Sequence, residues 1–141
     1  LHKALVALRR MRDWIVIDLP GQIDELTATV LELADRVLLV LTPEITSLRG
    51  AKVLLERAGR LGLAGERIVP VLNRFPQPGG LERDVIEQAL GLPLQVVPDE
   101  PRLVTYSINR GVPIVLSHGN SKAARHIGTL AKGLVQAARG R

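Results

Sequence analysis

Four short apolar runs, separated by stretches with helical spacing, constrain the fold of this chain more than any other feature. The runs are residues 14–18 (WIVID), 37–41 (VLLVL), 68–72 (IVPVL) and 94–97 (LQVV). They are apolar throughout rather than alternating, which is typical of strands buried on both faces of a parallel sheet. The pattern predicts an α/β fold, part of a doubly wound and mainly parallel sheet with helices on both faces.

The stretches between the runs carry helix signals. Helices are predicted at residues 24–34, 46–61, 81–90 and 121–138. Asp24 is a predicted N-cap, and Gly62 and Gly91 are predicted stops. The apolar stripe of the last helix predicts packing against the sheet. Pro70 lacks an N–H, so it predicts an edge strand or a bulge at 68–72.

Length and composition favour one domain over residues 1–141. The chain has no cysteine, which excludes disulfides and thiolate metal sites and fits a reducing, cytoplasmic setting. Its longest apolar runs are too short to span a bilayer. Because it starts at Leu1 without a Met, we expect it to be a piece of a longer protein.

Charge is distributed unevenly along the chain. Residues 1–100 carry 12 basic and 14 acidic side chains, whereas residues 101–141 carry 7 basic side chains and no acidic one. This asymmetry predicts an anionic partner for the C-terminal region, either DNA or a membrane surface. The alternative is a solvated basic helix face with no partner.

Polar and turn residues follow each predicted strand. The four stretches are Asp18–Gly21, Thr42–Glu44, Asn73–Phe75 and Pro98–Pro101. In open parallel sheets, ligands bind beyond the carboxyl ends of the strands, so these stretches predict one site at one edge. The alternative is that parallel strands need such turns whatever the function.

Asp18 and Asn73 have the chemistry of a nucleotide site. A carboxylate at a strand end can orient magnesium-bound water, and Gly21 would let the backbone approach a phosphate. The amide of Asn73 matches the hydrogen-bonding edge of adenine. No acidic residue stands two places after Asn73, which disfavours guanine. The alternatives are a capping Asp in a tight turn and an Asx-turn Asn.

Several segments together resemble a known family. The segments are DWIVIDLPG, ADRVLLVLTPEITSLRGAKVLL, VLNRF, VVPDEPRLVTYSINRGVPIV and the closing helix. In this order they resemble the second half of a MinD/ParA-type ATPase of the SIMIBI class of P-loop proteins. The nearest subgroup is CpaE/TadZ, the pilus-assembly and polar-localisation ATPases. The resemblance covers nearly the whole chain.

The resemblance implies a role for each site residue. Asp18 would be the switch II aspartate, which contacts Mg through water, with Gly21 in the same switch. Around the nucleotide, the implied binding residues are Thr42, Pro43, Asn73, Arg74, Pro98 and Asp99, with Asn73 and the Pro98–Asp99 loop flanking adenine. Gly111 and Asn109 would close a helix. The complete domain would bind ATP and Mg, dimerise, and act with pilus-assembly or localisation proteins, in the cytoplasm or at the inner face of the membrane.

The family's phosphate-binding loop is missing from this sequence. No stretch has the G-x-x-x-x-G-K-[ST] spacing, and HGNSK at 118–122 fits an N-cap better. We therefore expect the chain alone to hydrolyse no ATP. In the resembled fold, the phosphate-loop strand lies between the strands equivalent to 14–18 and 37–41. Without it, one edge of each of these two strands has no neighbour. We expect the two open edges to pair with each other or with a second chain. Alternative functions are a non-catalytic localisation or scaffold module and a module that binds DNA or an anionic surface.

Overall fold

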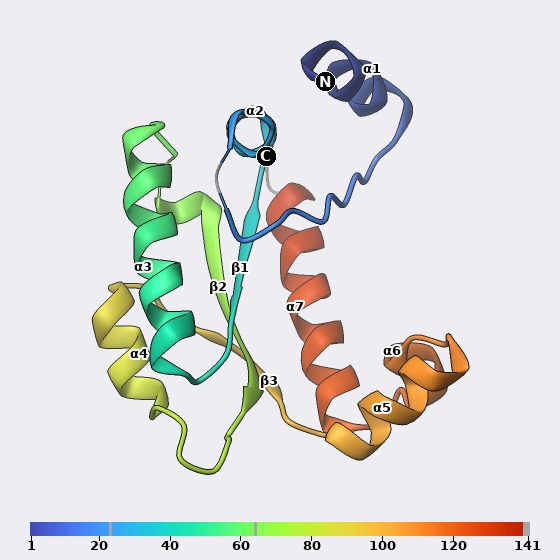
Figure 1. Cartoon of the computed structure of the whole chain (residues 1–141). Coiled ribbons are helices and arrows are strands. Elements are labelled where there is room, and N and C mark those ends of the chain that lie inside the picture. The colour runs from blue at the N-terminus through green and yellow to red at the C-terminus, as the bar shows by residue number, and fades with distance from the viewer. Residues whose placement is uncertain (23, 64, 140–141) are drawn as a thin grey trace.

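A computed structural model describes residues 1–22, 24–63 and 65–139 (Figure 1). The elements in chain order are α1 (His2–Met11), α2 (Glu25–Leu33), β1 (Val37–Leu41), α3 (Ile45–Arg60), a 3-10 turn (Gly65–Arg67), β2 (Ile68–Phe75), α4 (Arg83–Leu90), β3 (Gln95–Pro98), α5 (Pro101–Arg110), α6 (Ile114–Ser117) and α7 (Lys122–Arg139).

The three strands form one parallel sheet in the order β1-β2-β3. Val37 pairs with Ile68 on one side of β2, and Val71 pairs with Gln95 on the other. Helices α3 and α4 lie on one side of the sheet and α7 on the other (Figure 1). The predicted α/β class, with a parallel sheet between helices, is confirmed.

The core lies on both faces of β2, because successive side chains of a strand point to opposite faces. Leu72 is fully buried and belongs to the larger cluster, with residues of α3 and α4 such as Leu48 and Ile86. Val71 belongs to a smaller cluster with Ala123 of α7. The predicted packing of the last helix against the sheet is therefore confirmed.

The helix ends follow the predicted signals. The Asp24 carboxylate accepts a hydrogen bond from the Thr27 N–H at 2.8 Å, as an N-cap does. Gly91 has φ 66° at the end of α4, and Gly111 has φ 63° at the end of α5. The Ser121 hydroxyl accepts from the Ala124 N–H at 3.2 Å, so the predicted N-cap in HGNSK is also confirmed.

The predicted strand at 14–18 is wrong for this chain. These residues are extended but pair with no strand among the described residues, and Val16 is 93% exposed. The predicted closure of this edge on 37–41 is wrong as well. A short strand depends on hydrogen bonds to a neighbour, and the strand expected beside 14–18 is absent from the sequence.

The predicted edge position of Pro70 is also wrong. Pro70 is buried in β2, the middle strand, and lies opposite Leu39 of β1. Strand β3 pairs with β2 only from Val71 onward, so the missing N–H of Pro70 loses no bond to β3. The irregularity lies further along, between Asn73 and Phe75.

Within residues 1–22, 24–63 and 65–139, no helix combines the length and the apolar character needed to cross a bilayer.

Candidate functional site

The three strands end at the same edge of the sheet, because all are parallel. This edge brings together Thr42 and Pro43 after β1, Asn73 and Arg74 near the end of β2, and the Pro98–Asp99 pair at the end of β3. Ligands of open parallel sheets bind at such an edge. The structure therefore brings six of the eight predicted site residues to one edge, while their roles toward a nucleotide stay predictions.

The loop after β1 is held from two directions. The Thr42 N–H donates to the Ser47 hydroxyl at 2.9 Å, and the Pro43 carbonyl accepts from the Leu81 N–H at 2.7 Å. A Cβ on Gly80 would lie 3.0 Å from the Pro43 carbonyl oxygen, so only glycine fits there without a shift. Sequence reasoning missed Ser47 and Gly80; the Gly79–Gly80 pair was the available signal.

The end of β2 is irregular at the two residues predicted beside adenine. The backbone of Arg74 has φ 58°, in the left-handed region that residues other than glycine rarely adopt. Residues in this conformation concentrate at functional sites. The Arg74 N–H donates to the side-chain oxygen of Asn73 at 3.0 Å. This bond reaches only the next residue, whereas an Asx turn bonds the N–H two residues on, and it leaves the second lone pair of the amide oxygen available, so it supports neither reading of Asn73 over the other.

The end of β3 is tied to the last helix through Glu100. The Asp99 N–H donates to the Phe75 carbonyl at 3.3 Å, which fixes the loop beside β2. The Glu100 carboxylate accepts from the Ala123 N–H at 2.7 Å, at the N-terminus of α7. This hydrogen bond is the main reason that the pKa of Glu100 is lowered, and Lys122 adds a smaller attraction. The sequence placed Glu100 in the polar stretch Pro98–Pro101 but indicated no contact for it.

We expect stability to depend on pH through Glu100. The pKa of Glu100 is lower in the folded than in the unfolded chain, so its charged carboxylate stabilises the fold above the pH range in which glutamates ordinarily titrate. This stabilisation is lost as the pH falls through that range and below it. A Glu100→Gln variant keeps an acceptor but loses the charge. Its unfolding temperature should be lower than that of the parent chain at neutral pH and converge with it in acid. A Glu32→Gln control, at an exposed glutamate of α2, should follow the parent chain; equal behaviour of both variants would contradict this assignment.

Asp18 and Gly21 do not lie at this edge. Both are exposed in the unpaired stretch between α1 and α2. Figure 1 shows this blue stretch crossing the half of the sheet where the strands begin, while the strands end in the other half. A Cβ on Gly21 would meet no atom within 4 Å, so nothing here requires a glycine. The expectation that Asp18 ends a strand beside the other site residues is wrong in this chain, because no strand forms.

A Mg-ATP site is incomplete in this chain. Among the described residues, no group of three or more His, Cys, Asp or Glu side chains could hold a metal ion. The Asp18 stretch lies away from the carboxyl edge, and the sequence has no phosphate-binding loop. The loops at the carboxyl edge are the ones predicted to flank adenine, and that role stays a prediction.

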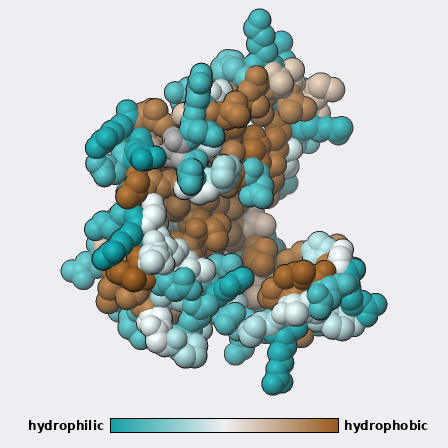
Figure 2. Space-filling model, viewed as in Figure 1, coloured by the Kyte–Doolittle hydropathy of each residue, from teal (hydrophilic) through white to brown (hydrophobic). Residues whose placement is uncertain are grey.

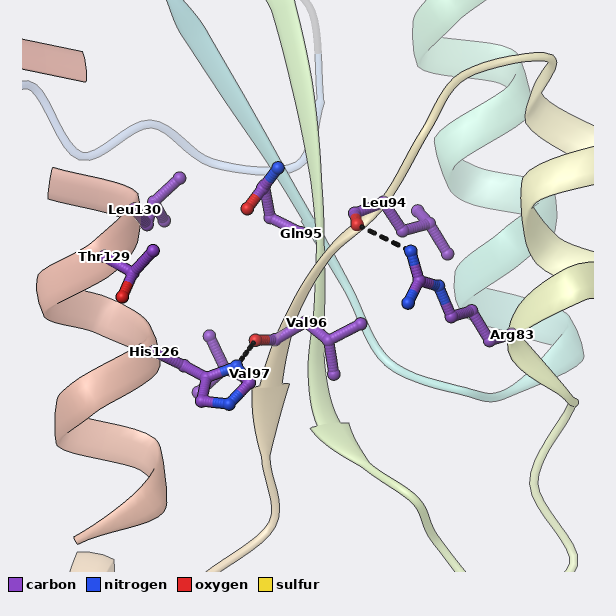
Figure 3. Close-up of a pocket in the computed structure, with 8 residues that line it drawn as sticks. All are labelled: Arg83, Leu94, Gln95, Val96, Val97, His126, Thr129 and Leu130. Atoms are coloured by element: carbon purple, nitrogen blue, oxygen red, sulfur yellow. Dashed lines mark hydrogen bonds between the residues drawn. The ribbon is translucent and has the colours of Figure 1, made fainter. Parts of the chain in front are cut away.

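A hollow of about 360 Å³ lies elsewhere, between β3 and α7 (Figure 3). It is lined by Arg83, Leu94, Gln95, Val96, Val97, His126, Thr129 and Leu130. Its basic groups are already bonded, because Arg83 donates to the Leu94 carbonyl at 3.4 Å and His126 to the Val96 carbonyl at 2.8 Å. None of the predicted site residues lines it. The His126 bond ties β3 to α7, and the Arg83 bond ties α4 to the residue just before β3.

Known proteins resemble this chain over most of its length. The family model of the cellulose biosynthesis protein BcsQ matches residues 1–134. The septum site-determining protein MinD of Thermotoga maritima is 31% identical over 126 residues, which cover 85% of this chain and 46% of that protein. The chain thus spans about half the length of that relative.

Two solved structures share the fold. The ParA family ATPase from Chlorobium tepidum TLS has a TM-score of 0.84 at 26% identity, over 92% of this chain and 55% of that one. The septum site-determining protein MinD from Pyrococcus horikoshii OT3, solved with Mg-ADP, has a TM-score of 0.80 at 24% identity, over 94% of this chain and 54% of that one.

These similarities define the class. The chain belongs to the BcsQ family, within the MinD/ParA-like P-loop ATPases. The resemblance to this class is confirmed, whereas the CpaE/TadZ subgroup stays a prediction.

Proposed function

We propose that this chain is the C-terminal part of an ATP-binding domain whose phosphate-binding loop lies upstream. The chain would supply the switch II aspartate and the adenine-side loops of a MinD/ParA-like ATPase. Two facts favour this division. The chain spans about half the length of its relatives, and its carboxyl edge holds Thr42, Asn73 and Asp99 without a phosphate cradle.

The observation that carries the proposal is the unfinished side of the sheet at β1. Strand β1 is the last strand on that side, so its outer edge has no partner among the described residues. Leu38 and Val40 are 41% and 59% exposed, on the face opposite the buried Leu39 and Leu41. Figure 2 shows apolar surface across the middle of the molecule, over the strands. A parallel strand added at this edge brings a crossover helix, which would cover that face.

The added strand would also order the Asp18 stretch. Residues 14–18 would pair with its far edge and end, as parallel strands do, at the edge that holds Asn73. Asp18 would then act on Mg-bound water, and Gly21 would let the switch approach the phosphates. ATP and Mg are the proposed cofactors. The similar MinD structure with Mg-ADP supports this nucleotide class by analogy.

Nucleotide binding by two lengths of the protein tests the proposal. A fluorescent ATP analogue with Mg²⁺ should bind weakly or not at all to the 141 residues and hydrolysis should be absent, because phosphate contacts supply most of the affinity. A chain extended upstream through the phosphate loop should bind it at least ~100-fold more tightly. Failure of the extended, folded chain to bind ATP would contradict the proposal and favour a non-catalytic localisation or scaffold module.

The assembly and location of the full protein follow from the same proposal. By analogy with its class, it would dimerise around ATP and act with pilus-assembly or localisation proteins, in the cytoplasm or at the inner face of the membrane.

A second candidate function rests on the seven basic residues and no acidic residue in 101–141. Binding to DNA or an anionic surface would then be steeply salt-dependent and weakened by neutralising Lys122, Arg125 and Lys132 together.

A further inference from the structure

Strand β3 forms one edge of the sheet, and its outer side has no strand beside it among the described residues. Such an edge presents main-chain N–H and C=O groups that can pair with a strand of another molecule. Natural edge strands usually carry charged side chains that prevent this pairing. The sequence from 88 to 98 contains no charged residue, and LQVV at 94–97 is mostly apolar. Protection of β3 must therefore come from other elements.

The main-chain groups of Leu94 and Val96 point away from β2. Successive residues of a strand turn their N–H and C=O groups to opposite sides. The Asp99 N–H donates to the Phe75 carbonyl of β2, and the alternation then turns residues 95 and 97 toward β2 as well. A strand added at the outer edge would first need the groups of Leu94 and Val96.

Side chains from two helices bond to these outward groups (Figure 3). From α4, the Glu87 carboxylate accepts from the Leu94 N–H at 2.9 Å, and Arg83 donates to the Leu94 carbonyl at 3.4 Å. From α7, the His126 Nδ1 donates to the Val96 carbonyl at 2.8 Å. Figure 3 shows Arg83 and His126 reaching this segment from opposite sides. A strand that paired here would have to displace all three bonds.

Glu87 and Arg83 also hold each other in place. The Arg83 guanidinium lies 2.9 Å from the Glu87 carboxylate, in an ion pair four residues apart on α4. The hydrogen bond from the Leu94 N–H is the main reason that the pKa of Glu87 is lowered, and Arg83 lowers it further. The carboxylate is therefore charged at neutral pH. Charge-assisted hydrogen bonds are roughly twice as strong as neutral ones, so this one is hard to displace.

We propose that Arg83, Glu87 and His126 block the outer edge of β3 against pairing with the same edge of a second copy. The strand carries no charge that would repel its own copy, and two copies could pair about a twofold axis. The groups that the three side chains now hold would then bond to the other strand. The block is independent of nucleotide binding, because the upstream strand is proposed at β1, the other edge of the sheet.

Removing the block tests the proposal. The double variant Glu87→Ala with His126→Ala frees the Leu94 N–H and the Val96 carbonyl for a second strand. Its dimer dissociation constant, measured by sedimentation equilibrium, should lie at least ~10-fold below that of the parent, or below the highest concentration at which the parent is monomeric. The same shift should appear in the chain extended upstream. Circular dichroism checks folding.

His126→Ala alone keeps the α4 side chains and covers the case in which the double variant does not fold. It releases a single hydrogen bond of an exposed side chain. Self-association should then strengthen by about threefold or more, in line with the net contribution of one hydrogen bond.

Further substitutions separate edge pairing from other association. Gln95 lines the hollow beside this edge, and Gln95→Lys added to the double variant should restore the monomer, because a lysine on an edge strand opposes pairing. Gln136→Lys, at an exposed residue further along α7, adds the same charge elsewhere and should change nothing. Glu56→Ala with His2→Ala removes the same residue types from α3 and α1 and should behave as the parent.

Two kinds of result would overturn the proposal. The first is a folded His126→Ala or double variant that associates no more strongly than the parent. The second is association that Gln95→Lys leaves in place, or that the Glu56→Ala, His2→Ala control reproduces, because the contact between copies would then lie away from the edge of β3.

Discussion

Replacing Asp18 by Asn in the chain extended through the phosphate loop is expected to lower ATP turnover by about 100-fold or more. The carboxylate is proposed to orient Mg-bound water, and an amide carries no charge with which to do so. The change keeps the size of the side chain, so ATP binding should stay within about threefold, less than 0.7 kcal/mol. Turnover and equilibrium binding of ATP, measured on the same preparations, check both parts.

Asp13 provides the control. It is also exposed and lies just before the same extended stretch, and Asp13→Asn should leave turnover unchanged. Equal loss in both variants would show a general effect of charge. Unchanged turnover in Asp18→Asn would contradict the switch II assignment. It would not decide whether the extended chain binds ATP, which is tested separately.

Elements with strong local signals were predicted well. The strand at 37–41 has the predicted bounds, and α4 ends at Gly91 in the left-handed conformation that a glycine stop requires. The Asp24 cap was also found, because its bond reaches only to Thr27. These features depend on residues within one turn or one strand, so the sequence pattern contains the information that determines them.

Elements that depend on a distant neighbour were predicted poorly. Residues 14–18 have strand composition, but a strand exists only with a hydrogen-bonded partner, and the described residues supply none. The missing N–H of Pro70 predicts an edge strand or a bulge, but the late start of β3 lets the middle strand accept this proline. Tertiary pairing decided both cases.

The candidate site divides in the same way. Its location at the carboxyl edge followed from the parallel strands, which sequence spacing predicted. The contacts that shape the edge were not predicted, because they join residues far apart in the chain. Leu81 donates to the Pro43 carbonyl, and Glu100 accepts from the Ala123 N–H. No local pattern specifies such pairs.

A substitution at Val40 tests whether an upstream strand and helix complete the sheet, as proposed, or whether the three-stranded sheet is already complete. Its side chain is 59% exposed in the 141-residue chain, so Val40→Ala should change the free energy of unfolding by less than about 0.5 kcal/mol. In the extended chain the crossover helix would cover Val40. The loss of two buried carbon atoms should then cost about 2 kcal/mol, from transfer and cavity terms together. Urea denaturation of both lengths measures the difference.

Leu39 calibrates the comparison because it is buried against α3 and α4 whether or not anything is added at β1. Leu39→Ala should cost about 2–5 kcal/mol in both lengths of chain. Suppose that Val40→Ala lowers the free energy of unfolding only in the extended chain, while Leu39→Ala lowers it equally in both lengths. The added segment must then pack on the face of β1 that carries Val40. If Val40→Ala is as harmless in the extended chain as in the short one, the upstream segment does not complete this sheet, and the route by which Asp18 reaches the nucleotide edge is lost with it.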